Sequence, residues 1–284
     1  MAKQTVLAIL QAAKQQLQMA GQDPELAQYL MLEGNQWRFT ELVQHYREAL
    51  SPIQTQAFQA QLARVCAGEP AQYVLGYAPF YGREFQVTPA TLIPRPETEE
   101  LVEWVLQVVQ QPTTAKVIDV GTGSGAIAVT LKKERPTWLV TATDISDAAI
   151  AVAQKNAQRL TAQLTWATGD LLAPVTGQRF DVIVSNPPYI DRTEMPEMDT
   201  SVKRYEPEQA LYAADHGLAF YQRFAQVLTT YLVPTGDFFA EIGYHQGAAV
   251  KRIFKQALPD AQVTVKSDIN GHDRMIHVHL ASKG

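Results

Sequence analysis

The sequence contains a single cysteine, Cys66, among its 284 residues. One cysteine cannot form an intramolecular disulfide, and it cannot supply the thiolates of a cysteine-based zinc site within one chain. Long apolar runs are also absent, since no stretch approaches the ~18 apolar residues of a membrane span. The first residues, MAKQTVLAILQAAKQQLQ, lack the unbroken apolar core of a secretory signal peptide. We therefore expect a reduced, cytoplasmic protein with no membrane partner.

Positive charge is scarce as well. Lys and Arg number 24 and Asp and Glu number 29, which gives a formal net charge of −5. Domains held to nucleic acid by bulk charge usually carry a basic patch or stripe, so stable nucleic-acid binding is not expected. Hydrophobic residues make up 46% of the chain, which excludes a disordered protein and allows a substantial buried core.

The hydrophobic pattern divides the chain into two parts joined by a linker. Through residues 1–75 apolar residues recur at helical spacing, which predicts a small all-α helical bundle. Asp23-Pro24 and Ser51-Pro52 each place a capping residue before a proline suited to the first helical position, so helices are expected to begin there. Residues 76–95 are rich in proline, glycine and aromatic residues, which predicts a linker with a β-hairpin.

From residue 96 to residue 284, short β-rich runs alternate with helical patterns. This alternation predicts an α/β domain with a seven-stranded, doubly wound, Rossmann-like sheet. The predicted strands are Lys116–Val120, Leu139–Thr143, Leu164–Ala167, Phe180–Ser185, Asp237–Glu241, Gln262–Lys266 and Met275–Leu280. Helices are expected at 126–133, 147–160, 218–231 and 246–257.

A glycine-rich loop follows the first predicted strand. The run from Asp119 to Ala126 reads DVGTGSGA, and its glycines allow a tight turn and close approach of a ligand to the main chain. Asp144 ends the second strand, where its carboxylate can accept hydrogen bonds from two ribose hydroxyls. Because Gly121, Gly123 and Ala126 also satisfy the dinucleotide pattern, loop and acid together fit either NAD or S-adenosylmethionine.

Two further acidic positions bear on that choice. Asp119, near the loop, could hold a ligand ammonium but would repel a pyrophosphate, which favours S-adenosylmethionine. Asp170 and Leu171 follow the third strand, where a carboxylate and an apolar side chain could bracket an adenine. The choice between the two cofactors needs another motif.

That motif is Asn186-Pro187-Pro188-Tyr189, directly after the fourth predicted strand. An amide or amine nitrogen on a planar group is a poor nucleophile because its lone pair is delocalised. The Asn186 side-chain oxygen and the Pro187 carbonyl could both accept hydrogen bonds from its NH₂ group, and neither proline has an N–H to donate. This would localise the lone pair and direct it at a methyl sulfonium, with Tyr189 stacked over the planar group. The motif therefore predicts methyl transfer driven by positioning and electrostatics.

His277 and His279 alternate on a predicted strand and could suggest a pair of metal ligands. No third ligand stands at a recognisable spacing in the sequence, and methyl transfer needs no metal. We therefore expect no metal and ordinary strand positions for both histidines.

The glycine loop and the Asn-Pro-Pro-Tyr motif together resemble the HemK/PrmC family of N5-glutamine methyltransferases. Further matches are Gly68-Glu69-Pro70, the run LIPRPETE at Leu92–Glu99, and Glu241-Ile242-Gly243, and the resemblance covers nearly the whole chain. It implies an S-adenosylmethionine-dependent enzyme that methylates the GGQ glutamine of class I peptide chain release factors and releases S-adenosyl-L-homocysteine. Such a modification acts on translation termination.

The resemblance also implies roles for individual residues. With Asp119 from the argument above, the expected cofactor-binding residues are Asp119, Gly121, Thr122, Gly123, Ser124, Gly125, Asp144, Asp170, Leu171 and Asn186. The expected catalytic and substrate-binding residues are Asn186, Pro187, Pro188 and Tyr189. Some relatives carry an aromatic residue at the position of Leu171. The helical residues 1–75 would help to bind the release factor.

An adenine-N6 or cytosine-N4 DNA methyltransferase is the alternative, because such enzymes use the same motif on the exocyclic amine of a flipped base. They usually need a basic target-recognition region. Residues 1–88 hold six basic and seven acidic residues, and no long insertion follows Tyr189. Charge therefore favours a protein substrate. A non-enzymatic adaptor that only binds the cofactor is a second alternative, against which the intact Asn186 and Tyr189 argue.

Overall fold

The computed structural model of the protein describes residues 4–111 and 113–281. Its contacts divide the chain into two compact units. One contains the residues up to Tyr77 together with Asp199–Tyr205, and the other contains Ala78–Met198 and the residues from Glu206 onward. None of the helices in the described part of the chain has the length and apolarity needed to cross a membrane.

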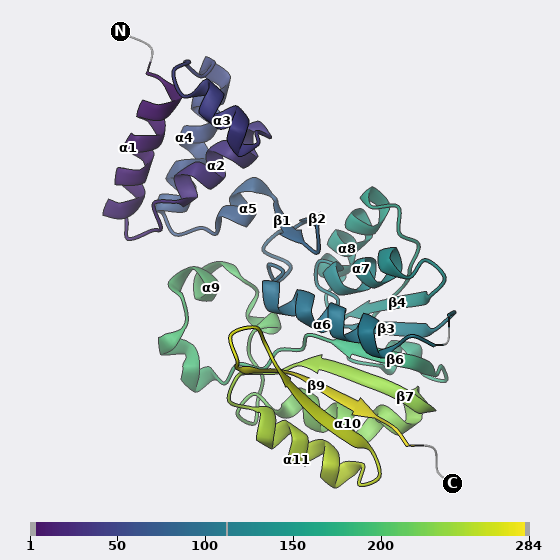
Figure 1. The fold of residues 1–284 in the computed structure, drawn as a ribbon. Coiled ribbons are helices and arrows are strands. Elements are labelled where there is room, and N and C mark those ends of the chain that lie inside the picture. Colours follow the sequence, from purple (N-terminus) through teal and green to yellow (C-terminus); the bar gives the residue numbers. More distant parts are fainter. Residues whose placement is uncertain (1–3, 112, 282–284) are drawn as a thin grey trace. The chain divides into compact units, whose positions relative to one another are not determined.

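The first unit is a bundle of short helices (Figure 1). They are α1 (Val6–Met19), α2 (Leu26–Asn35), α3 (Phe39–His45), α4 (Pro52–Cys66), α5 (Ala71–Leu75) and the separate α9 (Thr200–Tyr205). Leu10, Leu30 and Phe58 are among the apolar side chains that form its buried core, while the Gln and Lys residues between them are exposed or only partly buried. This arrangement confirms the predicted all-α bundle, in which α1, α2 and α4 each bury one apolar stripe.

The two predicted helix starts have different outcomes. Ser51 caps α4 as predicted, since its hydroxyl accepts from the Gln54 N–H at 3.3 Å and Pro52 occupies the first turn. The start predicted at Asp23-Pro24 is wrong, because α2 begins only at Leu26. The Asp23 carboxylate accepts from the Glu25 N–H at 2.9 Å and closes a turn before the helix.

The second unit is built on a seven-stranded sheet with the order β5-β4-β3-β6-β7-β9-β8. Its strands are β3 (Lys116–Val120), β4 (Leu139–Asp144), β5 (Thr165–Thr168), β6 (Phe180–Ser185), β7 (Leu232–Glu241), β8 (Gln262–Ser267) and β9 (Asp273–His279). β9 pairs antiparallel with β7 and β8, and the other neighbours are parallel. The predicted doubly wound sheet is confirmed. β7 starts earlier than predicted because Pro234 and Gly236 interrupt its β-pattern in the sequence.

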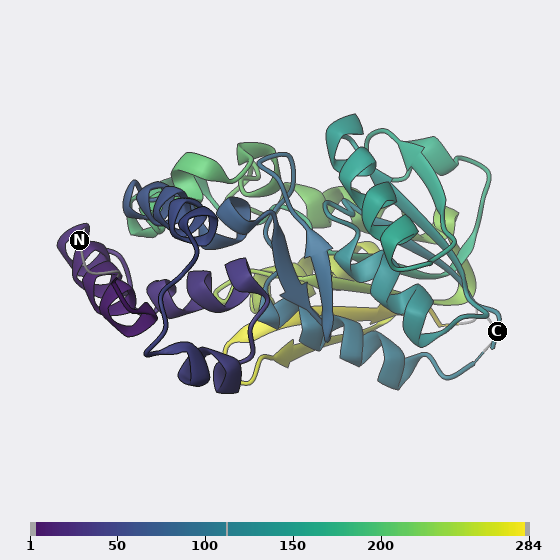
Figure 2. The same cartoon turned by 90° about the horizontal axis from the view of Figure 1, so that it is seen from above.

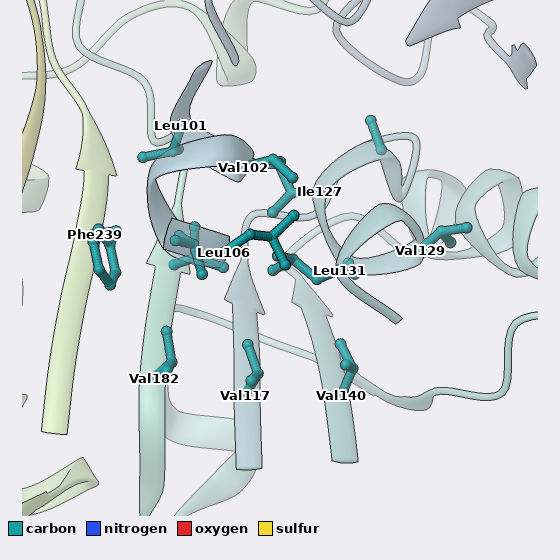
Figure 3. Close-up of a cluster of buried hydrophobic side chains, with 14 of the residues drawn as sticks. Leu101, Val102, Leu106, Val117, Ile127, Val129, Leu131, Val140, Val182 and Phe239 are labelled. Carbon is teal, nitrogen blue, oxygen red and sulfur yellow. The ribbon is translucent and has the colours of Figure 1, made fainter. Parts of the chain in front are cut away.

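Helices cover both faces of this sheet (Figure 1). α6 (Pro96–Val108), α7 (Ala126–Glu134) and α8 (Asp147–Arg159) pack on one face, and α10 (Ala219–Tyr231) and α11 (Gly247–Ala257) pack on the other. Figure 3 shows Leu101 and Val102 of α6 and Leu131 of α7 above Val117 and Val140 of the sheet. Burial on both faces explains why the central strands read as nearly continuous apolar runs. Short 3₁₀ turns lie at Ala173–Val175, Arg192–Glu197 and Glu208–Ala210.

A small hairpin precedes the large sheet. β1 (Tyr77–Phe80) and β2 (Arg83–Gln86) form a two-stranded sheet, and Figure 2 shows them side by side. The wholly buried side chain of Asn156 on α8 binds the last residue of the hairpin, Gln86. Asn156 Nδ2 donates to the carbonyls of Gln86 at 2.9 Å and Ser124 at 2.8 Å, and its Oδ1 accepts from the Gln86 N–H at 2.7 Å. One amide thus joins the hairpin, α8 and the glycine loop.

Replacement of this amide should destabilise the fold. Asn156→Ala leaves the Gln86 N–H and the two carbonyls without their partner, and an unsatisfied buried group costs about 1–3 kcal/mol. We expect the free energy of unfolding in urea, followed by tryptophan fluorescence, to fall by about 2–4 kcal/mol. Gln158→Ala, on the exposed side of α8, is the control and should change stability by less than about 0.5 kcal/mol. Equal stabilities of the two variants would contradict this role.

Candidate active site

The order of the strands creates a switch point between β3 and β6. From β3 the chain proceeds to β4 and β5 on one side of the sheet, and it then returns to β6 on the other side. Open parallel sheets bind ligands in the crevice at the carboxyl ends of the strands beside such a point. A cavity of about 540 Å³ lies there, lined by the segments that follow β3, β4, β5 and β6. This volume is within the range of small-molecule sites.

The glycine loop after β3 forms one wall of the cavity. Gly121, Gly123 and Gly125 have φ angles of 74°, 56° and 83°, a region that residues with a Cβ rarely adopt. The N–H groups of Gly121 and Thr122 both donate to the Thr143 carbonyl at 2.9 Å. These bonds fasten the loop to the end of β4 and leave its main chain facing the cavity.

Asp144 lines the cavity at the end of β4. Its Oδ2 accepts from the Gly123 N–H at 2.9 Å, and its Oδ1 accepts from the Ser146 N–H at 2.9 Å. Partial burial raises the pKa of Asp144, and these backbone donors offset part of the effect. Each carboxylate oxygen retains acceptor capacity, so the group can receive two further hydrogen bonds from a diol.

The segment after β5 brings Asp170 and Leu171 to the cavity; the sequence predicted that these two residues border an adenine. Asp170 is exposed, and its Oδ2 accepts from Arg223 at 2.5 Å. Phe220 and Arg223 of α10 also line this end. Sequence reasoning missed both, because α10 shows only the apolar stripe of a core helix and no motif. Phe220 thus places an aromatic side chain on the cavity wall.

Asp119 does not belong to the described residues that line the cavity. It is fully buried beneath the loop, where its Oδ2 accepts from the Thr122 hydroxyl at 2.6 Å and from the Ala128 N–H at 3.2 Å. Its Oδ1 has no hydrogen-bond partner in the described part of the chain. Burial raises the pKa of Asp119 to about 7. The carboxyl thus supports the loop from behind, and not from the cavity wall, where the sequence predicted a contact with a ligand ammonium.

The Asn-Pro-Pro-Tyr motif divides between the cavity and the protein interior. Asn186, Pro187 and Pro188 line the cavity, and the Asn186 Nδ2 donates to the Thr98 hydroxyl oxygen at 3.1 Å. Tyr189 is absent from the described lining, and its hydroxyl donates to Glu241 Oε1 at 2.9 Å. Burial raises the pKa of Tyr189 far above its ordinary value. The buried Glu241 carboxylate thus holds the hydroxyl of Tyr189, and the stacking of its ring on the substrate stays a prediction from the sequence.

Comparisons with known proteins agree with this arrangement. Residues 8–76 match the family model of the PrmC N-terminal domain, and residues 100–202 match that of the methyltransferase small domain. A release factor glutamine methyltransferase from Enterococcus faecalis is 42% identical over 267 residues, which cover 94% of this chain and 96% of the relative. One from Staphylococcus aureus is 41% identical over 261 residues, covering 91% and 93%.

This chain belongs to the release factor glutamine methyltransferase family. The resemblance to HemK/PrmC enzymes is thereby confirmed. A solved methyltransferase from Pyrococcus furiosus supports the fold alone, with 16% identity, a TM-score of 0.55, and coverage of 78% of this chain and 98% of that one.

The loop of the Asn-Pro-Pro-Tyr motif in this methyltransferase is held by residues that the sequence did not single out. Gln246 Nε2 donates to the Tyr189 carbonyl at 2.7 Å. A Cβ at Gly217 would lie 2.0 Å from the same carbonyl oxygen, so only glycine fits there. Both residues come late in the chain and carry no motif, so only the folded structure reveals their contact with the loop.

Arg95, which belongs to the run LIPRPETE, lines the cavity and pairs with Glu206. Glu206 is buried, and its second oxygen accepts from the Ile93 N–H at 3.2 Å. The pair therefore fastens the LIPRPETE segment of this methyltransferase to the chain before Pro207, which also lines the cavity.

His277 and His279 lie on β9 beside Asp237 of β7. The sequence shows no third potential ligand at a recognisable spacing, but the structure supplies one in Asp237, which is adjacent in the sheet and distant in sequence. Asp237 Oδ1 lies 2.7 Å from His277 Nε2 and 2.8 Å from His279 Nδ1. These are hydrogen-bond lengths, shorter than the separation of about 3.3 Å that Zn–N bonds of about 2.0–2.1 Å give between tetrahedral ligands. The three groups thus satisfy one another.

Titration of Asp119 should make the free energy of unfolding depend on pH. Because burial raises its pKa to about 7, the native state retains a proton between about pH 4 and pH 7 that the unfolded chain has released. The free energy of unfolding therefore falls as the pH rises through this interval, by at most ~1.4 kcal/mol per pH unit from this group. Asp119→Asn lacks the titration and keeps an acceptor oxygen for Thr122 and Ala128.

We therefore measure the free energy of unfolding in urea for Asp119→Asn and wild type at a series of pH values. As the pH rises from about 5 to about 7, the free energy of unfolding of the variant should increase relative to that of the wild type. Gln154→Ala, at an exposed position, removes no titratable group; it is the control and should give a constant difference. A constant difference for Asp119→Asn would show that the carboxyl does not titrate in this interval.

Proposed function

We propose that this protein transfers the methyl group of S-adenosylmethionine to the side-chain nitrogen N5 of the GGQ glutamine in class I peptide chain release factors, and so acts on translation termination. The observation that carries the proposal is the pair of acceptors at Asn186 and Pro187 on the wall of the cavity, in a chain of this family. The relatives are named for the same reaction.

The residues of the cavity fit S-adenosylmethionine better than a dinucleotide. The glycine loop would hold its methionyl end, Asp144 its ribose, and Leu171, Phe220 and Asp170 would border its adenine. A pyrophosphate would find no unpaired cation here, because Arg95 and Arg223, the basic residues in the described lining, are each paired with a carboxylate. The cofactor itself supplies an activated methyl group, and the proposed reaction uses no metal.

The catalytic work of the protein is to orient an amide nitrogen. The glutamine NH₂ group would donate one hydrogen bond to Asn186 Oδ1 and one to the Pro187 carbonyl. These bonds would hold its lone pair in line with the methyl group, which is positioning of the kind that gives large rate enhancements. The nitrogen forms the new N–C bond, the S–CH₃ bond breaks to leave S-adenosyl-L-homocysteine, and one N–H proton is released.

The remaining parts of the chain have proposed roles that follow from the resemblance. Residues 1–75 would bind the release factor, residues 76–95 would act as the linker, and residues 96–284 would carry out methyl transfer. A cytoplasmic location, and the absence of membrane and stable nucleic-acid binding, remain predictions from composition. The adenine-N6 DNA methyltransferase is not favoured, because the relatives are named for release factors.

The proposal is tested by incubating the full-length protein with tritiated S-adenosylmethionine and either a class I release factor or duplex DNA. We expect label in the release factor, located by mass spectrometry on the GGQ glutamine, and none in the DNA. Label in DNA alone would overturn the proposal.

Asn186→Ala tests the amide contact in the same assay. Loss of one positioned hydrogen-bonding group typically lowers turnover by about 10²-fold or more. We expect a loss of that size in kcat, with cofactor affinity measured by calorimetry nearly unchanged. A kcat near that of the wild type would rule out the amide contact.

Asp144→Ala tests the proposed binding of the cofactor ribose. Each hydrogen bond to a charged group contributes about 1.5–3 kcal/mol, and 1.4 kcal/mol is tenfold in affinity. We expect the Kd for S-adenosylmethionine to rise at least about tenfold in calorimetry. Asp147→Ala removes an exposed carboxylate close by in the sequence and should leave the Kd unchanged. Equal Kd values for the two variants would argue against ribose binding by Asp144.

A further inference from the structure

A chain of hydrogen bonds runs from Asn186 into the protein interior. Asn186 Nδ2 lies 3.1 Å from the Thr98 hydroxyl oxygen, and that oxygen lies 2.7 Å from Glu241 Oε2. The other carboxylate oxygen of Glu241, Oε1, accepts from the Tyr189 hydroxyl at 2.9 Å. Thr98 is 4% exposed and Glu241 is 1% exposed, so water does not substitute for these partners. The three segments involved are the start of α6, the end of β7 and the loop after β6.

The protons available on each group decide which group donates and which accepts in these hydrogen bonds. A hydroxyl has one proton to donate, whereas an ionised carboxylate only accepts. Thr98 must therefore donate its proton to Glu241, which leaves its oxygen as an acceptor toward Asn186. Only the NH₂ side of the Asn186 amide can donate to that oxygen. The Asn186 Oδ1 is thereby turned away from Thr98 and is available as an acceptor in the cavity.

We propose that Thr98 and Glu241 are positioning residues that set the orientation of the Asn186 amide, so that the cavity presents an acceptor and selects a carboxamide NH₂ over a carboxylate. The inference rests on the proposed role of Asn186 in methyl transfer and explains how that role is enforced. A glutamine donates to such an acceptor, while the carboxylate of a glutamate would be repelled by it.

The donors and acceptors in these hydrogen bonds exchange roles if Glu241 gains a proton that it donates to Thr98. A protonated carboxyl can donate to Thr98, whose own proton then turns to Asn186 Oδ1, and the amide presents its NH₂ group to the cavity. Two NH₂ groups would then face each other without an acceptor between them. Activity should therefore require the ionised form of Glu241.

The surroundings of Glu241 contain both signs of charge. Burial raises its pKa, while Thr98 of α6 and Tyr189 donate to it and Arg274 of β9 favours its ionised form. The negative charge of Glu97 of α6 disfavours the ionised form of Glu241 and raises its pKa. From α10, the Tyr221 hydroxyl donates to the backbone carbonyl of Glu241 at 2.8 Å. The pKa of Glu241 stays above its ordinary value, so kcat should decline on the acid side at a higher pH than an exposed glutamate would cause.

The experiment uses three variants of the full chain on the substrate that the wild type labels. Thr98→Val removes the hydroxyl at nearly constant volume, and Thr98→Ser keeps it. Glu241→Gln leaves one acceptor oxygen for the two hydroxyls, of Thr98 and Tyr189, that donate to the carboxylate, and places an NH₂ group beside the other. We expect Thr98→Val and Glu241→Gln to lower kcat by about 10²-fold, the size of effect that misplacement of a reacting group produces. Thr98→Ser should remain within about threefold of wild type, well under the tenfold that corresponds to 1.4 kcal/mol.

Three further readouts separate positioning from a purely structural role. The Kd for S-adenosylmethionine should be unchanged in all variants, the loss should fall in kcat more than in KM, and Glu241→Gln should lack the acid limb of the kcat profile. Thr130→Val is the matched control, because the buried Thr130 hydroxyl has no partner in the described part of the chain. It should retain full activity.

The inference is overturned if Thr98→Val and Glu241→Gln keep a kcat near that of wild type, or if Thr98→Ser is as impaired as Thr98→Val while both are folded by thermal melting. If Thr98→Val fails to fold, the kcat of the nearly isosteric Glu241→Gln variant tests the inference instead. A wild-type protein that labels DNA and not release factors would refute the proposed function. The variants would then be measured on DNA, because an exocyclic amine needs the same acceptor.

Discussion

A hydrogen-bond acceptor facing the cavity is the interaction on which the proposed chemistry depends. An amide nitrogen becomes a nucleophile only when its protons are drawn to acceptors that leave the lone pair directed at the methyl group. Asn186 and the Pro187 carbonyl can provide such acceptors, and no backbone N–H from either proline competes with them. The buried pair of Thr98 and Glu241 makes the side-chain amide an acceptor and not a donor on the cavity side.

The fold brings these groups together because parallel strands end at one edge of a sheet. The glycine loop follows β3, Asp144 ends β4, and Asn186 follows β6, which pairs with β3. Helices on both faces bury the strands and leave this edge open. Hydrogen bonds of the loop to Thr143 and of Asn156 to Ser124 then hold the glycine loop in place before any ligand arrives.

The parts of the fold that depend on local pattern were predictable. Apolar runs located the strands, and the glycine loop and Asn186 lie at strand ends where the sequence placed them. Contacts between distant segments were not predictable. The sequence marked Thr98 and Glu241 inside two family signatures, but their hydrogen bond depends on how α6 packs against β7.

Two side chains of the cavity motifs turn their polar groups toward the protein interior. Asp119 and Tyr189 both belong to motifs that touch the cavity, yet each carries a polar group that found a partner in the interior, Thr122 in one case and Glu241 in the other. Asp237 was missed for a different reason, since the strand pairing that brings it to His277 joins residues far apart in sequence. A motif indicates which segment lies at a site, while burial and hydrogen bonding decide which way each side chain turns.

The central claim is that the cavity selects a carboxamide because it presents an acceptor. The most direct measurement compares kcat/KM for a release factor with its GGQ glutamine and for the same factor with glutamate at that position. Sites built to hydrogen-bond a substrate N–H reject analogues without it by about 10⁴-fold, so a ratio of that order is expected. Methyl-ester formation on the glutamate factor within about tenfold of the glutamine rate, a difference worth only about 1.4 kcal/mol, would contradict it.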